Sequence, residues 1–245
     1  MKKPAVVPAK VQPTPSPTPA PAPESSKKNE RPQDGGSRSS DAAKKVANFT
    51  PTYFYEFNRP GFLTARVIIE HDASGKGRIS FEKKDFNELV TDPIQLSAAT
   101  VEGIDAALAR LDFWASTEDY QYEKDLSNMG QNSFKFKKNG RERAVKFNWT
   151  TNKDAKFLMD EYRRISNEYV WKFDMVVARE NQPLESPRML DGLDMYVQRG
   201  EITDPPHIIP FLKELSEDER LPLIARNHAS RIIKHIEKTA KKPSQ

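Results

Sequence analysis

The chain has 245 residues, of which 36% are hydrophobic and 30% are charged, and it contains no cysteine. The missing thiols exclude disulfide bonds, thiolate catalysis and cysteine-ligated zinc or iron–sulfur sites. No stretch approaches the roughly 18 apolar residues that a transmembrane helix needs. The composition therefore predicts a well-solvated globular protein with no transmembrane segment in this chain.

The positive charge is concentrated near the N-terminus. Residues 1–46 hold nine basic and four acidic residues, which leaves 30 basic and 31 acidic residues in the remainder. The net charge of +4 therefore comes from the first 46 residues. A nucleic-acid-binding domain usually carries a basic excess of its own, and residues 47–245 carry none.

Residues 1–48 are predicted to form a disordered tether. Nine of the 19 prolines precede residue 33, and Pro, Ala, Ser and Thr at this density favour extended polyproline II without an apolar face. Met1-Lys2-Lys3 is similar to the start of a signal peptide, but Pro4 follows and no apolar region comes after it. The compartment stays open: periplasm or cell envelope if an export signal was removed, and cytoplasm otherwise. Residues 241–245 are predicted to be a short disordered tail.

Residues 49–182 are predicted to form an α+β domain around an antiparallel sheet of about five strands. The first part of this region alternates apolar and polar residues with a period of two, and Gly-containing segments separate the runs. Strands are expected at residues 52–57, 62–71, 78–84 and 93–96, followed by a hairpin around Asn139-Gly140.

Two helices are expected to pack on this sheet. Apolar residues recur at three- and four-residue spacing over residues 100–112 and again over 153–180. Side chains that cap helix N-termini precede both runs. The candidate caps are Ser97 or Thr100 for the first helix, and Thr150, Thr151 or Asn152 for the second.

The segment "SFKFKKNGRERAVKFNW", residues 133–149, predicts the register of the hairpin. An Asn-Gly turn of two residues favours type I′ and fixes the pairing of the flanking strands. Directly paired residues share a face of the sheet. The predicted pairs are Lys138–Arg141, Lys137–Glu142, Phe136–Arg143, Phe134–Val145 and Asn132–Phe147.

This register places the aromatic side chains and the lysines on opposite faces. Proteins that stack nucleic-acid bases present aromatic and basic groups on one exposed face, so a core face and a solvated face are the simpler interpretation. Lys135, Lys137 and Lys146 are nevertheless the candidate phosphate contacts, in a weak and sequence-independent mode. Arg143 falls on the aromatic face, where it either stacks on a ring or reaches solvent at the turn.

Residues 183–240 are predicted to form three helices. Ser186 with Pro187 begins the first, which Gly200 ends. Asp204-Pro205 begins the second, and a capping box at Ser216–Glu219 opens the third. The last two helices resemble a single HEAT-type repeat of about 35 residues. Because a solenoid needs about three repeats to bury a continuous core, we expect these helices to dock on the sheet domain or on a partner.

The polar stretch "ARNHASR", residues 225–231, contains the candidate partner-binding residues. Arg226 and Asn227 lie off the apolar stripe of the last helix, and His228 borders it. A hydrogen bond that fixes two helices together is the simpler interpretation. Contact of Arg226, Asn227 and His228 with a protein partner is the alternative.

No catalytic, cofactor or metal site is predicted. The sequence contains no GxSxG, SxxK, P-loop or HExxH motif. Of its four histidines, His228 and His235 are seven residues apart, which places them about 10.5 Å apart along a helix axis. That separation is too large for two ligands of one zinc ion.

Taken together, residues 52–180 and the preceding Pro-rich segment resemble small domains of exported bacterial proteins. The resemblance implies no particular activity. We expect a non-enzymatic binding or scaffolding module of the bacterial cell envelope, displayed on a flexible tether, with a protein partner. Two alternatives stay open. One is a nucleic-acid-associated protein that uses the Lys-rich tail and the hairpin lysines, and the other is an enzyme with a site in the cleft between sheet and helical segment.

Overall fold

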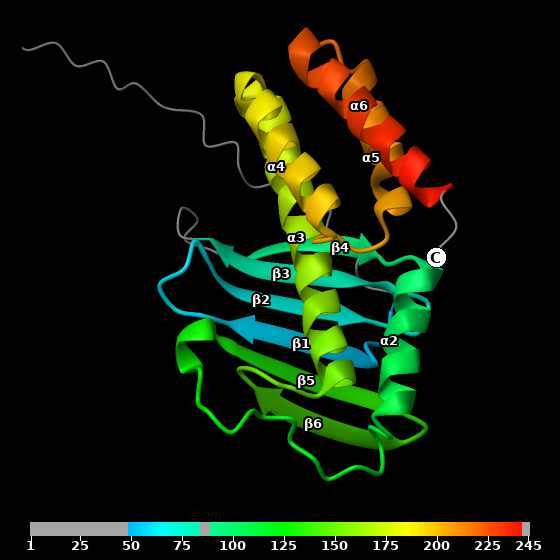
Figure 1. The fold of residues 1–245 in the computed structure, drawn as a ribbon. Helices are drawn as coiled ribbons and strands as arrows, with labels where there is room; N and C mark the ends of the chain where they lie inside the picture. Colours follow the sequence, from blue (N-terminus) through cyan, green and yellow to red (C-terminus); the bar gives the residue numbers. More distant parts are fainter. Residues whose placement is uncertain (1–48, 84–88, 242–245) are drawn as a thin grey trace, which may run out of the picture. The chain divides into compact units, whose positions relative to one another are not determined.

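The computed structural model describes residues 49–83 and 89–241, and all of them belong to one compact unit. The predicted tether, residues 1–48, and residues 242–245 of the predicted tail lie outside the described residues. An antiparallel sheet followed by a helical segment confirms the predicted α+β fold, with six strands in place of about five (Figure 1). No described helix is both long and apolar enough to cross a membrane.

The sheet has the strand order β4-β3-β2-β1-β5-β6, so β1 lies inside it and pairs with both β2 and β5. Alternate residues of each strand face the helices and are buried, as the period of two predicted. The opposite face carries cross-strand ion pairs such as Arg66–Glu56. The strands are β1 (Tyr53–Asn58), β2 (Thr64–His71), β3 (Lys76–Lys83), β4 (Val90–Gln95), β5 (Gln131–Lys138) and β6 (Arg141–Phe147).

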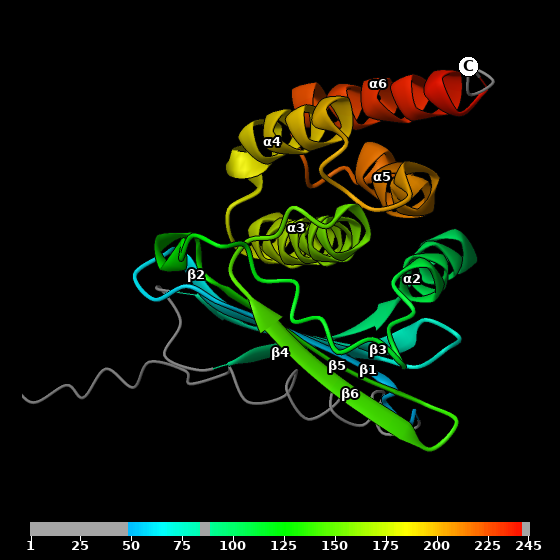
Figure 2. The same ribbon diagram turned by 60° about the horizontal axis from the view of Figure 1, so that its bottom comes forward.

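Helices α2 (Ala98–Arg110) and α3 (Lys153–Asn181) lie on the same face of the sheet (Figure 2). The Ser97 hydroxyl accepts from the Thr100 amide at 3.2 Å and caps α2. The Asn152 side chain accepts from two first-turn amides and caps α3. Both caps are among the predicted candidates, and they satisfy N–H groups that the first helical turn leaves unpaired.

The predicted hairpin register is confirmed for every pair from Lys138–Arg141 to Asn132–Phe147. Asn139 and Gly140 have φ angles of 52° and 75°, both in the left-handed region that a type I′ turn requires. The sequence of the turn therefore determined which side chains of β5 and β6 enter the core.

The three helices of the C-terminal segment lie over α3, on the side away from the sheet (Figure 2). Gly200 ends the first with a φ of +65°, as predicted. Three short 3₁₀ turns accompany the longer elements. The helices are α4 (Ser186–Arg199), α5 (Ile209–Glu217) and α6 (Leu223–Ala240), and the turns are η1 (Ser127–Met129), η2 (Pro183–Glu185) and η3 (Pro205–Ile208).

The predicted capping box at Ser216–Glu219 is wrong. Helix α5 continues through Ser216, whose hydroxyl donates to the Lys213 carbonyl inside the same helix. Helix α6 begins directly after Pro222. Between the two helices the chain turns at Asp218, whose carbonyl accepts from the Leu221 amide at 3.0 Å, and the residue before Pro222 is kept out of the helical region.

The buried apolar side chains form two cores that share α3. The first core contains the inner face of the sheet, α2 and the part of α3 up to Tyr169. The second contains Trp171 and Met175 of α3 together with the apolar faces of α4, α5 and α6. The helical segment is therefore docked on the sheet layer through one helix that contributes to both cores.

Candidate functional site

A cleft of about 580 Å³ lies at one end of the sheet, between the sheet, α3 and α4. Its volume falls within the range of roughly 300–1,000 Å³ that is usual for small-molecule sites. Segments far apart in the sequence meet there: β1, the β1–β2 loop, β2, η1, α3 and α4. The lining residues are Tyr55, Phe57, Arg59, Phe62, Thr64, Val67, Met129, Arg163, Ser166, Asn167, Val170, Trp171, Asp174 and Tyr196.

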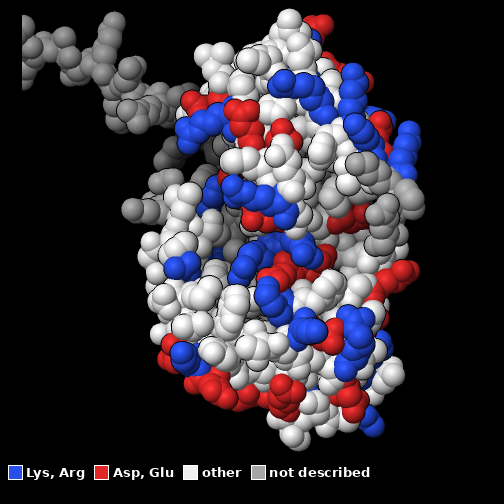
Figure 3. All heavy atoms as spheres, in the orientation of Figure 1, with Lys and Arg blue, Asp and Glu red and all other residues white. Residues whose placement is uncertain are grey.

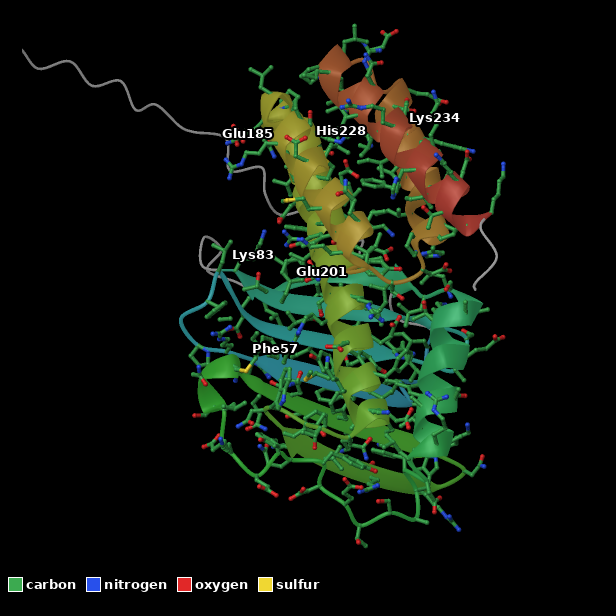
Figure 4. The ribbon with its side chains drawn as sticks, in the orientation of Figure 1. Phe57, Lys83, Glu185, Glu201, His228 and Lys234 are labelled. Atoms are coloured by element: carbon green, nitrogen blue, oxygen red, sulfur yellow. The ribbon has the colours of Figure 1, made fainter. Side chains whose placement is uncertain are left out.

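Aromatic rings form much of the wall of this cleft. Phe57 is near the end of β1, Trp171 comes from α3 and Tyr196 from α4. Figure 4 labels Phe57 at one end of the sheet. Phe62, in the β1–β2 loop, is 49% exposed. An exposed ring beside a concave surface provides apolar area that a ligand can cover.

Gly130, between η1 and β5, allows the chain to pass close to this wall. Its φ is +91°, a backbone conformation that residues other than glycine rarely adopt. A Cβ at this position would lie 2.6 Å from the Phe57 ring and 3.0 Å from the Arg59 Cβ. Glycine at residue 130 therefore lets Phe57 and Arg59 keep the positions from which they line the cleft.

Two guanidinium groups face the cleft, and neither is held closely by a carboxylate. Arg59 lies over the Phe62 ring, 3.4 Å from its centroid, and no carboxylate of the described residues pairs with it. Arg163 is 48% exposed, and its Nη1 is 3.8 Å from Asp160 Oδ1. Because a guanidinium group keeps its charge and presents several donors in a plane, both arginines can bind an anionic group.

The other polar side chains of the cleft are held by contacts within the fold. Asp174 forms an ion pair with Lys83 at the end of β3. The Asn167 amide donates to the Glu201 carbonyl at 2.9 Å, and the Ser166 hydroxyl donates within α3. Lys83 and Glu201 are both labelled in Figure 4. The arginines are therefore the charged groups of this cleft that are most available to a ligand.

Charged side chains of both signs are interspersed across the face that carries α3 (Figure 3). On this face the i,i+4 pair Lys156–Asp160, at 2.5 Å, lies next to Arg163. Within the cleft lining the charged residues are Arg59, Arg163 and Asp174, and Asp174 is paired with Lys83.

The hydroxyl groups of Ser166 and Thr64 line the cleft without a base as hydrogen-bond partner among the described residues. An activated nucleophile needs a base within hydrogen-bond reach, and in the described part of the chain no imidazole or carboxylate is bonded to Ser166 or Thr64. Burial raises the pKa of Tyr55 far above its usual value, so its hydroxyl stays neutral and donates to Asn132 at 2.9 Å. Among the described residues, the cleft therefore offers two guanidinium groups and apolar surface.

The predicted partner-binding residues lie apart from this cleft, on α6. The His228 ring is 7% exposed; its Nδ1 is 3.2 Å from Asp191 and its Nε2 is 3.4 Å from Asp194, both on α4. Figure 4 shows His228 where α4 and α6 approach each other. Asn227 is exposed and Arg226 is half-buried. His228 thus makes an interhelical contact, and partner contact by the three residues stays a prediction.

The three hairpin lysines have different surroundings. Lys135 and Lys137 both pair with Glu142, at 2.9 and 3.0 Å, which includes the predicted Lys137–Glu142 pair. The hydrogen bonds from these two lysines lower the pKa of Glu142. Lys146 is exposed beside Ser133 and forms no ion pair with a described residue. Of the three, Lys146 alone keeps its charge unpaired in this part of the chain.

The histidines do not come together with carboxylates to form a metal site. Within residues 49–83 and 89–241, no three side chains of His, Asp or Glu lie close enough to hold an ion. His71 is fully buried and stacks on Tyr53 with the ring centroids 4.6 Å apart. The Tyr162 hydroxyl bonds to His71 Nε2 at 2.8 Å. Burial lowers the pKa of His71 to about 4, so its ring is neutral near pH 7.

Arg143 stacks on the core and also holds a loop. Its guanidinium lies 4.7 Å from the Phe113 ring centroid. It donates to the carbonyls of Phe113 and Glu118 and to the Tyr120 hydroxyl. Of the two positions that the sequence left open, the stacked one is therefore observed, and the same side chain anchors the connection from α2 to β5.

No protein-family model matches this chain, and no curated protein sequence matches it. The function is therefore inferred from the geometry of the cleft.

Proposed function

We propose that this protein is a non-enzymatic binding module whose cleft takes a ligand with an acidic group and an apolar body. The observation that carries this proposal is the presence of Arg59 and Arg163 in the same cleft as the exposed Phe62 ring. Small-molecule sites typically combine apolar walls with a few polar groups that orient the ligand.

The physical chemistry of the two parts of the cleft supports a ligand of this kind. A guanidinium group binds a carboxylate, sulfonate or phosphate through two parallel hydrogen bonds. Arg59 already stacks on Phe62, which orients it. The rings of Phe57 and Trp171 offer the surface on which the apolar body would lie. Because Asp174 is paired with Lys83, its charge does not oppose an anion.

The proposal also places this module in the bacterial cell envelope, with the Pro-rich residues 1–46 as its spacer. The composition of that segment and its resemblance to exported bacterial proteins support this location. Fractionation of the native cells tests it. Recovery of the protein only from the cytosol would contradict the location and would leave the binding proposal for the cleft to its own test.

Binding to the cleft can be tested with 8-anilinonaphthalene-1-sulfonate, which joins an aromatic body to one anionic group. We expect saturable binding, visible as probe fluorescence and as a change in emission of Trp171. The variants Arg59→Gln and Arg163→Gln should each weaken binding by roughly 10- to 150-fold, because a charged hydrogen bond contributes about 1.5–3 kcal/mol. The uncharged N-phenyl-1-naphthylamine should bind more weakly than the sulfonate.

Arg78→Gln is the matched control, since Arg78 lies on the opposite face of the sheet and pairs with Glu70. It should leave the affinity for the sulfonate unchanged. Equal affinity of the wild type, Arg59→Gln and Arg163→Gln would rule the cleft out as the site, as would binding that does not saturate.

A further inference from the structure

Strand β6 forms one edge of the sheet, because it pairs only with β5 among the described strands. The side of β6 to which each backbone N–H and C=O group points can be derived from one hydrogen bond of β5. The Lys137 amide donates to the Thr52 carbonyl at 2.8 Å, toward the β1 side. Backbone groups of successive residues point to opposite sides of a strand, so those of Phe136 point toward β6 and meet Arg143.

The backbone N–H and C=O groups of Glu142, Ala144 and Lys146 therefore point away from the sheet. All three residues are exposed. Figure 2 shows β6 as the outermost strand at the front of the sheet. An edge with unpaired backbone groups is a template on which another strand can pair.

This free edge has a defined end. The Asn148 amide, which follows the same alternation and points outward, donates to the Gln121 side chain at 3.0 Å. Gln121 in turn donates to the Asn148 side chain at 2.8 Å. A side-chain amide thus occupies the position that a neighbouring strand would take. The part of the edge that can pair is limited to residues 142–146.

We propose that this edge pairs with the same edge of a second copy of the chain. In an antiparallel pair centred on Ala144, residue 142 of one chain lies opposite residue 146 of the other. Glu142 then faces Lys146 of the partner subunit, and Lys146 faces the partner subunit's Glu142. The sequence of the edge is therefore complementary to itself, which a two-fold interface requires.

The charges of the edge favour this register. Lys146 forms no ion pair with a described residue, and pairing gives it a carboxylate. Glu142 already lies near Lys135 and Lys137 on its own hairpin, and it gains a third cation from the other side. Opposite charges directly across two strands stabilise the pair, whereas like charges destabilise it.

Charged residues on an edge strand usually prevent pairing with another strand. Whether they prevent or favour pairing depends on how the charges are spaced along the strand. Here the opposite charges lie at equal distances from Ala144, so they attract in the two-fold register. The contact involves a short strand and is smaller than most stable interfaces. The dimer is therefore weak and depends on protein concentration.

Sedimentation velocity of the full chain over a wide range of concentration tests this proposal. The wild type should show a monomer–dimer equilibrium. Lys146→Glu and Glu142→Lys should each weaken it about tenfold or more, because two attractive pairs become repulsive. The double variant should regain the dimer, and so should an equal mixture of the two single variants, since both restore opposite charges.

Two control variants carry the same changes of charge away from this edge. Lys234→Glu on α6 and Glu102→Lys on α2 alter exposed residues and should leave the dimer unchanged. Ala144→Pro removes only an outward N–H, so the ladder to β5 and the circular dichroism spectrum should be retained while the dimer is lost.

A wild type that stays monomeric at every concentration would overturn the proposal. A dimer that Ala144→Pro and both charge reversals leave unchanged would do the same. A monomer that instead binds an extended peptide along β6 would assign the edge to a different partner.

Discussion

The two cores of this molecule are built from different kinds of side chain. The core on the sheet is rich in Phe and Tyr, and its polar groups form buried hydrogen bonds such as His71–Tyr162. The core of the helical segment is mainly Leu, Ile and Ala, with Trp171 as its one aromatic residue among the buried side chains described. Buried polar groups require partners in fixed positions, so the first core is the more specific, and its buried His71 makes its stability depend on pH.

Among the described glycines, Gly77 leaves the least room for a side chain, and replacing it should give the largest effect. A Cβ on Gly77 would lie 2.0 Å from the Glu70 carbonyl oxygen and 2.7 Å from the His71 Cβ. Gly77→Ala should therefore cost more than about 4 kcal/mol, measured by urea denaturation. Gly192→Ala in α4 is the control, because nothing lies near its Cβ; it should stabilise the protein by about 0.5–1 kcal/mol. A mild effect of Gly77→Ala would show that the sheet can relax there.

A deletion in the helical core tests whether the two cores unfold together. Leu212→Ala should cost about 2–5 kcal/mol, since Leu212 is fully buried. Because α3 belongs to both cores, emission of Trp171 and the signals of Trp114 and Trp149 on the sheet side should change at the same urea concentration. Separate transitions for the two sets of tryptophans would contradict this coupling.

The pH dependence should separate the two cores more clearly. The pKa of His71 falls from 6.5 to about 4 on burial, so the unfolded chain binds the proton more tightly. The neutral His71 ring therefore contributes to the free energy of unfolding in full above pH 6.5. This contribution decreases by about 3 kcal/mol as the pH falls from 6.5 toward 4. His71→Gln should flatten the dependence of unfolding free energy on pH between 4 and 6.5. Leu212→Ala should shift the curve without changing this slope.

The smallest expected effect concerns the loop that Arg143 holds. Arg143→Lys keeps the charge but cannot bond three acceptors in one plane, so it should cost about 1–2 kcal/mol. Hydrogen exchange of residues 113–122 should become faster. Arg141→Lys, at the exposed turn, is the control and should change neither the exchange nor the stability. Unchanged protection in Arg143→Lys would show that the loop is held by Tyr120 and its other contacts.

Features encoded by a few neighbouring residues were predictable from the sequence. Asn139-Gly140 determined a register that is correct at every pair, because the turn type follows from the two residues themselves. Ser97 and Asn152 were among the predicted caps for the same reason. The capping box failed because Ser216 stays inside α5, where its hydroxyl donates to the Lys213 carbonyl. The turn that follows contains Asp218, which pairs with Arg179 from a distant part of the chain.

The candidate site was not predictable in this way. Its arginines and rings come from four segments, β1, the β1–β2 loop, α3 and α4, which meet only after the helices have packed. One local signal was present, since "FNRPGF", residues 57–62, places Arg59 between two phenylalanines at a Pro-Gly turn. The alternation of polar and apolar residues along β6 was also visible in the sequence. Which of its backbone groups point away from the sheet could be known only from the pairing of β5 with β1 and β6. Both the cleft and the free edge of β6 therefore depend on contacts between residues that are far apart in the sequence.

The continuity of α3 has a consequence for the way in which the cleft works. This helix of 29 residues is about 44 Å long, it supplies six of the residues that line the cleft, and it packs on both β2 of the sheet and α4. The width of the cleft is therefore set before a ligand arrives. Such preorganisation reduces the conformational entropy that binding removes. We expect ligands to exchange quickly, without a closing motion of the helical segment against the sheet.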